Sequence, residues 1–417
     1  MKFLDGIRNA LTGLGGSNDP GAANNYVLQH LTDQELIVMY NSSWLARQVV
    51  DIPANDATEK WRRWEGDDAD VAEEVAEFEA ELGVQAKINL AMSRARLLGG
   101  AAVLIGAGSP DAAEELVVDQ VTEIEYLTVL DRIDLISDTE ERDVTSPRFG
   151  LPKGYSTRVD GRNRPIHPSR LILFNGMDAG SRLNLHNLQG WGFSRLQPCA
   201  DAIKGYDSAM TSLKTLMHQA KTDVISIKDL TSRIADPNFE KNLKARLAII
   251  EATVGNHRKL IMDTEEEYTN SSYTFGGVAD SIKQFAVNVS GASDIPMTRL
   301  FGQSPGGMNS TGDSDLTNYY DNVAAIQKNE VSPAMRLFDQ VLLKAAGVQD
   351  DSVKPKWNPI KEMTEKEQAE IFGKKADAFS KVVSTQVFDD GDLAEAGAQL
   401  FATAGLEGLQ ASEEGEE

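Results

Sequence analysis

The residues from 196 to 217 carry the most regular hydrophobic pattern in the chain. Apolar side chains recur there in alternating steps of three and four over three heptads, at Leu196, Cys199, Ile203, Tyr206, Met210, Leu213 and Met217. A period of 3.5 residues predicts a long helix whose apolar stripe packs along another helix. The pattern fits either a core helix of a monomer or a helix shared with a neighbouring subunit.

The residues before this helix predict a mixed α+β module. Helical spacing from Leu31 is broken at Pro53, which indicates two helices. A third helix over 71–82 places an apolar stripe against the protein, and a fourth over 85–98 ends at two glycines. Short β-type segments follow, namely AAVLIGAG, EIEYLTVLDRIDLIS, GYSTRV and SRLILFNG.

The residues after 219 predict a small α/β insertion of roughly 55 residues. Its expected elements are a strand at VISIKDL, a helix over 237–251 and strands at HRKLIMD and EYTNSSYTF. A helix over 278–289 closes the insertion. The stretch 301–315 contains four Gly, one Pro and no Lys or Arg, which indicates a loop.

A long helical pattern over 313–346 follows this loop. Pro333 lies inside it and should kink or divide the helix, because proline lacks an N–H donor and clashes with the preceding turn. Thr364 and Glu367 form a capping-box pattern that opens a helix through about Val383. The last residues are acidic and are expected to be disordered at the extreme end.

The charge of the chain excludes a protein that grips DNA. It has 41 Lys and Arg against 64 Asp and Glu, a net charge of −23, whereas DNA binders neutralise phosphates with Lys and Arg. The acidic surplus is uneven and concentrates in Glu65–Glu81 and after Asp389. On charge alone, the sequence argues against a protein that binds nucleic acid tightly.

No arrangement of residues indicates an enzyme, and we expect no catalytic residue, metal or cofactor. The five histidines are scattered, and zinc, P-loop and nucleophile-elbow motifs are absent. His167 could act as a general base beside Ser169, although a turn residue at the start of a strand is the favoured interpretation. Cys199 lies on the apolar stripe and is expected to be a core residue.

Several segments resemble the portal proteins of tailed bacteriophages, the head–tail connector portal family, and in particular a compact subfamily of them. The resemblance lies in LTDQELIVMYNSSWLARQVVDIPANDATEKWR, IHPSRLILFNG, WGFSRLQP, WNPI and, most specifically, FGQSPGGMNSTGDSDLTNYYDNV. Together these segments span most of the chain between Leu31 and about Val383. The resemblance implies a portal-type α+β fold assembled as a ring, typically of twelve subunits.

The resemblance also implies a division of the chain. The expected parts are a flexible arm (1–30), an α+β wing (31–193), a stem helix (194–219), an α/β clip (220–276), a second stem helix (277–300), a tunnel loop (301–312), a long kinked helix and wing return (313–360), a short helical crown (361–405) and an acidic tail (406–417). The crown is short for the family.

Roles for single residues follow from the same resemblance. The tunnel loop that lines the DNA channel would contain Gln303, Ser304, Pro305, Gly306, Gly307, Met308, Asn309 and Ser310. Subunit packing would use Leu196, Ile203, Tyr206, Met210, Leu213 and Met217. Lys283 and Arg299 would be basic groups near the channel, and Pro333 the helix kink. Because the loop itself has no basic residue, it is not expected to grip phosphates.

The implied function is a portal at one capsid vertex, through which double-stranded DNA is packaged and ejected without sequence-specific binding. Expected partners are further copies of the chain, the terminase large subunit, a head–tail adaptor, and the major capsid and scaffold proteins, with no membrane. The location is the virion, after assembly in the bacterial cytoplasm. The alternatives are a virion structural or adaptor protein that forms no ring, and a hydrolase that uses His167.

Overall fold

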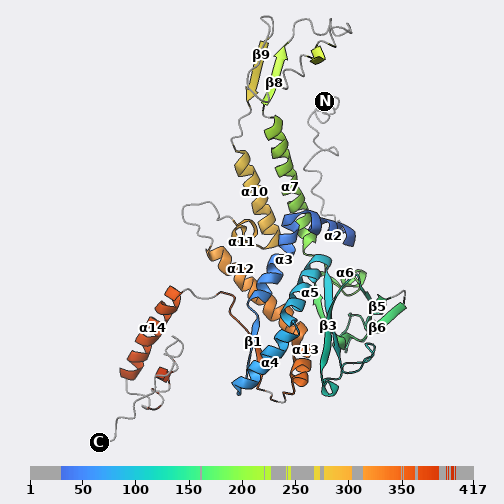
Figure 1. Cartoon of the computed structure of the whole chain (residues 1–417), viewed down its shortest axis with the longest axis vertical. Coiled ribbons are helices and arrows are strands. Elements are labelled where there is room, and N and C mark those ends of the chain that lie inside the picture. The colour runs from blue at the N-terminus through green and yellow to red at the C-terminus, as the bar shows by residue number, and fades with distance from the viewer. Residues whose placement is uncertain are drawn as a thin grey trace, which may run out of the picture.

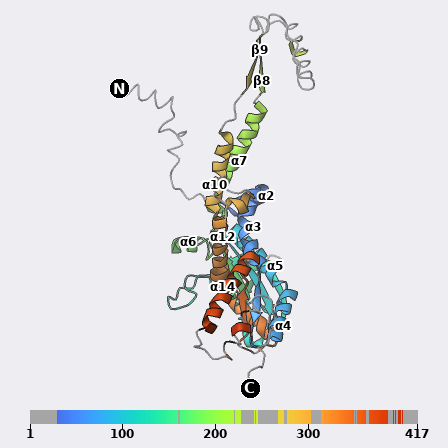
Figure 2. The ribbon, with the colours of Figure 1, turned by 90° about the vertical axis from the view of Figure 1, so that its left-hand side faces the viewer.

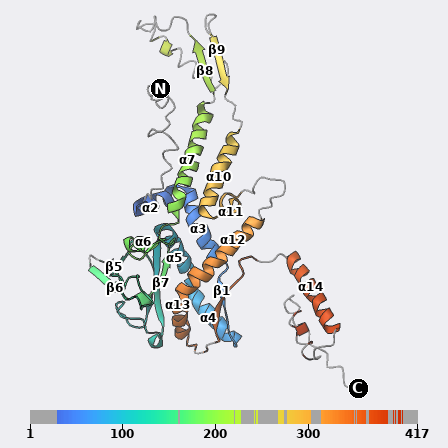
Figure 3. The ribbon, with the colours of Figure 1, turned by 180° about the vertical axis from the view of Figure 1, so that it is seen from behind.

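The computed structural model describes residues 30–159, 162–219, 221–226, 241, 243–245, 267–272, 277–302, 313–348, 350, 352–361, 365–384 and six positions between 391 and 400. Figure 1 shows a body of helices and small sheets from which two long helices, α7 (Leu196–Gln219) and α10 (Val278–Ser293), rise side by side. They carry a two-stranded sheet at their far end, and α14 (Glu365–Ser384) stands apart on one side of the body (Figure 3). The mixed α+β class expected from the sequence is confirmed.

The N-terminal part of the body is helical. Its helices are α2 (Asp33–Ser42), α3 (Trp44–Glu59), α4 (Ala69–Glu81) and α5 (Val84–Leu98). Thr32 and Glu35 form a reciprocal capping box at the start of α2. The apolar stripe predicted for α4 is present, with Val75 fully buried. Helix α5 ends at Gly99, whose φ of 87° favours glycine.

Helix α3 continues through Pro53, so the break expected there is wrong. Proline removes the N–H that would bond to the carbonyl four residues earlier, which belongs to Val49. Arg96 supplies the missing donors, because its Nη2 donates to the Val49 carbonyl at 3.0 Å and its Nε to the Val50 carbonyl at 2.9 Å. A side chain from α5 therefore allows the helix to continue.

Two three-stranded antiparallel sheets form the other side of the body. The first has the order β3 (Ile124–Asp131), β2 (Gly100–Ala107), β7 (Leu171–Asn175), and the second β4 (Leu135–Ser137), β5 (Tyr155–Val159), β6 (Arg162–Ile166). Strands β1 (Arg62–Glu65) and β10 (Lys354–Trp357) pair separately, as do β8 (Lys221–Ser226) and β9 (Glu267–Ser272). Strand β6 was not predicted.

Strand β2 separates two hydrophobic clusters. Val103 and Ile105 belong to the large core shared with the helices, whereas Ala102 packs with Tyr155 and Trp191 in a smaller cluster. This alternation follows from the two-residue period of a strand buried on both faces. A Cβ at Gly100 would lie 2.1 Å from the Trp191 ring, so the close approach requires glycine.

The C-terminal helices run from the paired helices back through the body. They are α10 (Val278–Ser293), α11 (Met297–Phe301), α12 (Asp313–Ile326), α13 (Ser332–Ala345) and α14 (Glu365–Ser384). A π-helical turn, Gln327–Val331, lies between α12 and α13 just before Pro333. The role of Pro333 as a kink stays a prediction. Helix α13 is anchored by Met335, Phe338, Val341 and Leu342, all fully buried.

Some predicted elements lie outside the described residues. These are the strand at 257–263, most of the helix over 237–251, and Thr364 of the predicted capping box. The described residues of the insertion are the β8–β9 pair and a few helical positions between 241 and 245. The helix predicted to follow residue 364 is confirmed as α14.

Candidate functional site

Helix α7 (Leu196–Gln219) changes from buried to exposed along its length. Leu196, Cys199 and Ile203 are at most 1% exposed, whereas Met210 is 40% and Met217 64% exposed on the same stripe. Figure 2 shows that α10 runs alongside this part of α7. The second half of the predicted seam therefore has apolar side chains without a complete packing partner in the single chain.

Helix α10 extends the exposed apolar surface. Phe285 and Val287 are 40% and 45% exposed, while Ala286 and Val289 are buried. Lys283, one of the two predicted basic residues near the channel, is exposed on the same helix. Single exposed apolar residues are normal, and others occur in the body and on α14, for example Val38, Val144 and Val383. Those on α7 and α10 differ in lying on the two helices that project from the body.

The start of α7 is held by a backbone crossing. The carbonyl of Gly99 accepts hydrogen bonds from the N–H groups of Gly176 and Gly192, both at 2.9 Å. A Cβ at Gly99 would lie 2.3 Å from the carbonyl oxygen of Gly192. The two backbone segments can therefore cross here only because residue 99 has no side chain. The crossing fixes the segment that leads into α7 against the end of α5.

A buried carboxylate connects α3 to both helices that flank residues 303–312. Asp56 is 4% exposed; it accepts hydrogen bonds from Arg299 Nη2 at 2.6 Å and Nε at 3.1 Å, and from the Tyr319 hydroxyl at 2.7 Å. Arg299 lies on α11 and Tyr319 on α12. The hydrogen bonds to Asp56 raise the pKa of Arg299, and burial, followed by the bond to Asp56, raises the pKa of Tyr319.

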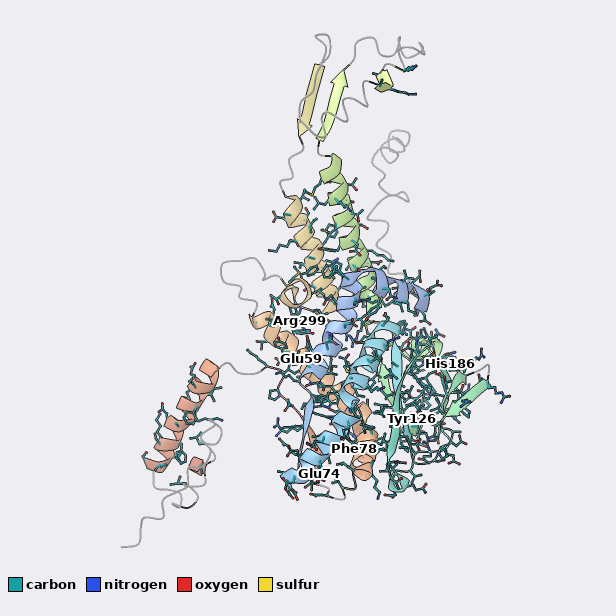
Figure 4. The ribbon with its side chains drawn as sticks, in the orientation of Figure 1. Glu59, Glu74, Phe78, Tyr126, His186 and Arg299 are labelled. Carbon is teal, nitrogen blue, oxygen red and sulfur yellow. The ribbon has the colours of Figure 1, made fainter. Side chains whose placement is uncertain are left out.

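These contacts place one predicted residue in a new setting. Arg299, expected near the channel, is engaged with Asp56 at the junction of the paired helices and the body (Figure 4). The expected tunnel-loop residues, 303–310, lie outside the described residues. Asp56 was not among the residues singled out from the sequence. The available signal was its position beside Ala57 on the face of α3 that is buried, where a carboxylate needs hydrogen-bond partners.

Replacing Asp56 by alanine is expected to destabilise the fold by about 1–3 kcal/mol, because the buried Tyr319 hydroxyl and one side of Arg299 lose their acceptor. Chemical denaturation of the full chain measures the change. Asp321→Ala is the matched control, since Asp321 is exposed on α12 and should change stability by less than about 0.5 kcal/mol. Equal losses in the two variants would contradict the role of Asp56.

His167 and Cys199 both have structural settings. His167 Nδ1 lies 2.7 Å from Ser169 Oγ, which accepts the N–H of Leu116 at 2.8 Å, so the pair holds a turn before β7. Burial raises the pKa of the Cys199 thiol to about 11, and its Sγ donates to the Ala292 carbonyl at 3.1 Å. The sequence interpretation of Cys199 as a core residue is confirmed.

A buried charged cluster under α4 was missed. Arg62 Nη2 lies 2.8 Å from Glu79 Oε1 and 2.6 Å from Asp339 Oδ1, and the Trp64 indole donates to Glu79 at 2.8 Å. The sequence predicted that α4 was an acidic surface helix, so Glu79 looked like one more solvated acid. Burial raises the pKa of Asp339, against the opposing effect of the Arg62 charge.

Among the described residues, no group of three or more His, Cys, Asp or Glu side chains is placed to hold a metal ion. No helix of the described part is both long and apolar enough to cross a membrane. The main features of the described part are the exposed apolar side chains of α7 and α10 and the helices that Asp56 holds on either side of residues 303–312.

Comparisons with known proteins agree with these features. The family model described as "Phage portal protein" matches residues 34–381. Two curated relatives, each named "Anti-CBASS protein Acb1", come from Caulobacter sp. (strain RHG1) and Sphingomonas paeninsulae; they are 35% and 33% identical over 90% of this chain. The chain spans only 62% and 61% of the length of these two relatives.

Solved structures share the fold at low sequence identity. A chain in a structure described as the neck of a native GTA particle, computed with C12 symmetry, matches with a TM-score of 0.54 and 12% identity, over 87% of this chain and 93% of that one. A chain from the neck of an empty GTA particle, computed with C6 symmetry, matches with a TM-score of 0.53 and 13% identity, over 91% of this chain and 96% of that one.

Proposed function

This chain belongs to the phage portal protein family, and we propose that it assembles as a twelve-membered ring at one capsid vertex, forming the channel for DNA packaging and ejection. The family places the protein at the neck of a virion as a structural component rather than as an enzyme. The C12 symmetry named for one structural neighbour supports a count of twelve. Double-stranded DNA, the terminase large subunit, a head–tail adaptor, and the major capsid and scaffold proteins are the proposed partners.

The observation that carries the proposal is the exposed second half of the α7 stripe. Met210 and Met217 of the stripe are 40% and 64% exposed, and the adjacent Leu216 is 47% exposed, although the same helix is buried at its start. Packing this surface against a neighbouring copy removes apolar area from water, and a closed ring satisfies every such interface. The surface would be the stem of the portal, with β8 and β9 in the clip and 303–310 in the tunnel loop.

The acidic charge suits a conduit. A net charge of −23 on each copy is compatible with a channel through which DNA slides, because like charge along the channel would lower the residence of phosphates at any point. The name of the two curated relatives concerns longer proteins, of which this chain covers about six tenths, so we assign their anti-CBASS property to those proteins alone. Nucleotide hydrolysis would be the task of the separate terminase.

Native mass spectrometry and negative-stain microscopy of the full chain test the proposal. Rings with a central hole are expected at micromolar concentration in both low and high salt. Monomers or dimers alone under all these conditions would contradict the ring and would favour a virion structural or adaptor protein that forms none.

The paired variant Met210→Glu and Met217→Glu is expected to convert rings to monomers. Each charge would be buried at a subunit contact, whereas in the single chain both side chains are exposed, so the monomer fold should change in stability by less than about 0.5 kcal/mol. The matched control is Ser212→Glu, an exposed position off the stripe of the same helix. Rings in the paired variant, counted by native mass spectrometry, would show that the stripe packs elsewhere.

A further inference from the structure

The β5–β6 hairpin is a basic feature on an acidic protein. Its strands carry three arginines, Arg158, Arg162 and Arg164, against one acid in the same stretch, Asp160. All three side chains are exposed. Within the described part of the chain, none of the three forms an ion pair or side-chain hydrogen bond. In the β5–β6 register Arg162 and Arg164 lie on one face of the hairpin, whereas Arg158, which pairs with Asn163, lies on the other. The hairpin therefore presents two free guanidinium groups on one face and a third on the opposite face.

Helix α4 presents the opposite charge. Its outer face and N-terminal turn carry seven exposed acids, Asp67, Asp68, Asp70, Glu73, Glu74, Glu77 and Glu81. None of them forms an ion pair among the residues that the structure describes. No Lys or Arg occurs between residues 64 and 87.

Several of these acids are spaced so that their negative charges repel one another. Asp70 and Glu74, Glu73 and Glu77, and Glu77 and Glu81 are pairs of like charge at i, i+4, a spacing at which such charges destabilise a helix. No basic side chain of the same chain relieves this repulsion among the described residues. A cationic partner from outside the chain would relieve it.

The two surfaces lie on different sides of the body. In Figure 1 the hairpin projects from one lateral edge and α4 lies at the other. Figure 4 shows the same separation, with Glu74 of α4 far from His186. His186 lies on α6 (Arg182–Asn187), beside the second sheet (Figure 1). Two complementary surfaces on different sides of one molecule are what a head-to-tail ring requires, since each contact joins one face of a copy to a different face of the next.

We propose that the β5–β6 hairpin of one copy docks on the acidic outer face of α4 of the next copy. This contact rests on the ring proposed above and adds to it a charged contact in the body, separate from the apolar surface of α7 and α10. Complementary charges of this kind fix orientation and suppress wrong pairings more than they add affinity. Arginine suits the role because its planar fork binds carboxylates in pairs.

Charge reversal on each surface tests the contact. One variant carries Glu73→Lys, Glu74→Lys and Glu77→Lys, and the other Arg158→Glu, Arg162→Glu and Arg164→Glu. Either variant alone would place like charges in every contact, and we expect the concentration needed for ring formation to rise about tenfold or more. Native mass spectrometry and negative-stain microscopy of the full chain measure it.

Mixing the two variants in equal amounts gives the decisive result. In an alternating ring, the arginine hairpin of the first variant faces the acidic α4 of the second, and the glutamate hairpin of the second faces the lysines of the first. Rings should therefore return on mixing and contain equal numbers of the two variants. A folding defect would not be repaired in this way.

The matched control is Lys374→Glu, Lys375→Glu and Lys381→Glu on α14, which changes the net charge as the hairpin variant does and affects exposed side chains only. It should form rings at the wild-type concentration. Absence of rings in the wild type overturns the proposed function itself, and this contact with it.

Three other results would overturn the contact alone. They are wild-type ring formation by each reversed variant, no recovery on mixing, and an equal loss in the α14 control. Rings that form normally from the hairpin variant but lose DNA would assign the hairpin to nucleic acid instead, which also overturns the contact.

Discussion

Deletion of Ser304–Met308 is expected to leave ring assembly intact and to stop DNA packaging. The deleted residues belong to the segment between α11 and α12, whereas the surfaces that we assign to subunit packing lie on α7, α10 and the body. The ends of the segment are held independently, because Asp56 accepts hydrogen bonds from Arg299 before it and Tyr319 after it. Ring counts by native mass spectrometry and an in vitro packaging assay measure the two effects.

A replacement variant separates the length of the segment from its chemistry. Replacing Pro305 and Met308 by Ser makes all five residues Gly or Ser and keeps the length. Packaging should survive if the segment acts by steric contact with passing DNA, since it contains no basic residue. Normal packaging and infectivity in the deletion variant would show that the segment is only a connection. Loss of rings would show that it belongs to the subunit interface.

Regular patterns allowed the main elements to be predicted from the sequence. The 3.5-residue stripe predicted α7, the apolar run after two glycines predicted the buried strand β2, and Pro333 predicted a kink or division near the π-helical turn between α12 and α13. Each of these features depends on residues close together in the chain. Local periodicity is therefore sufficient for them.

The features that were missed depend on distant residues. Pro53 is tolerated because Arg96, 46 residues beyond Val50, donates to the freed carbonyls. Asp56 is satisfied by side chains more than 240 residues away. Strand β6 has three exposed polar or charged residues and a proline, so it lacks the pattern of a strand, and its pairing with β5 is what forms it.

The subunit contacts show the same limit. The stripe on α7 indicates that a partner helix exists, but the sequence leaves open whether it belongs to the same chain or to a neighbour. In the single chain the two halves differ, because Leu196 and Ile203 are buried while Met210 and Met217 are exposed. We infer that the helix serves both purposes, as the root of the stem in one chain and as its contact surface in the ring.

Replacing Arg62 by methionine is expected to destabilise the body by about 3–5 kcal/mol, because Glu79 and Asp339 would be left as buried charges without their cation. Arg62 is 6% and Glu79 3% exposed, and the two connect β1 to α4. Chemical denaturation at neutral pH measures the change in the free energy of unfolding. Arg63→Met on the same strand is the control, since its pair with Glu65 is about half exposed and contributes about 0–1 kcal/mol.

The pH dependence of the stability lost in Arg62→Met shows whether the loss comes from carboxylates left buried without a cation or from lost packing. Burial raises the pKa of Asp339 above the ordinary value of 3.8, and the Arg62 charge opposes that rise. The folded state therefore binds the proton more tightly than the unfolded state, so the contribution of Asp339 to stability falls as the pH rises through the folded pKa. Without Arg62 that pKa moves higher, and the loss in Arg62→Met should be larger at about pH 8 than at about pH 5. A loss that is independent of pH, or equal to that of Arg63→Met, would mean that the cluster stabilises the body by packing alone.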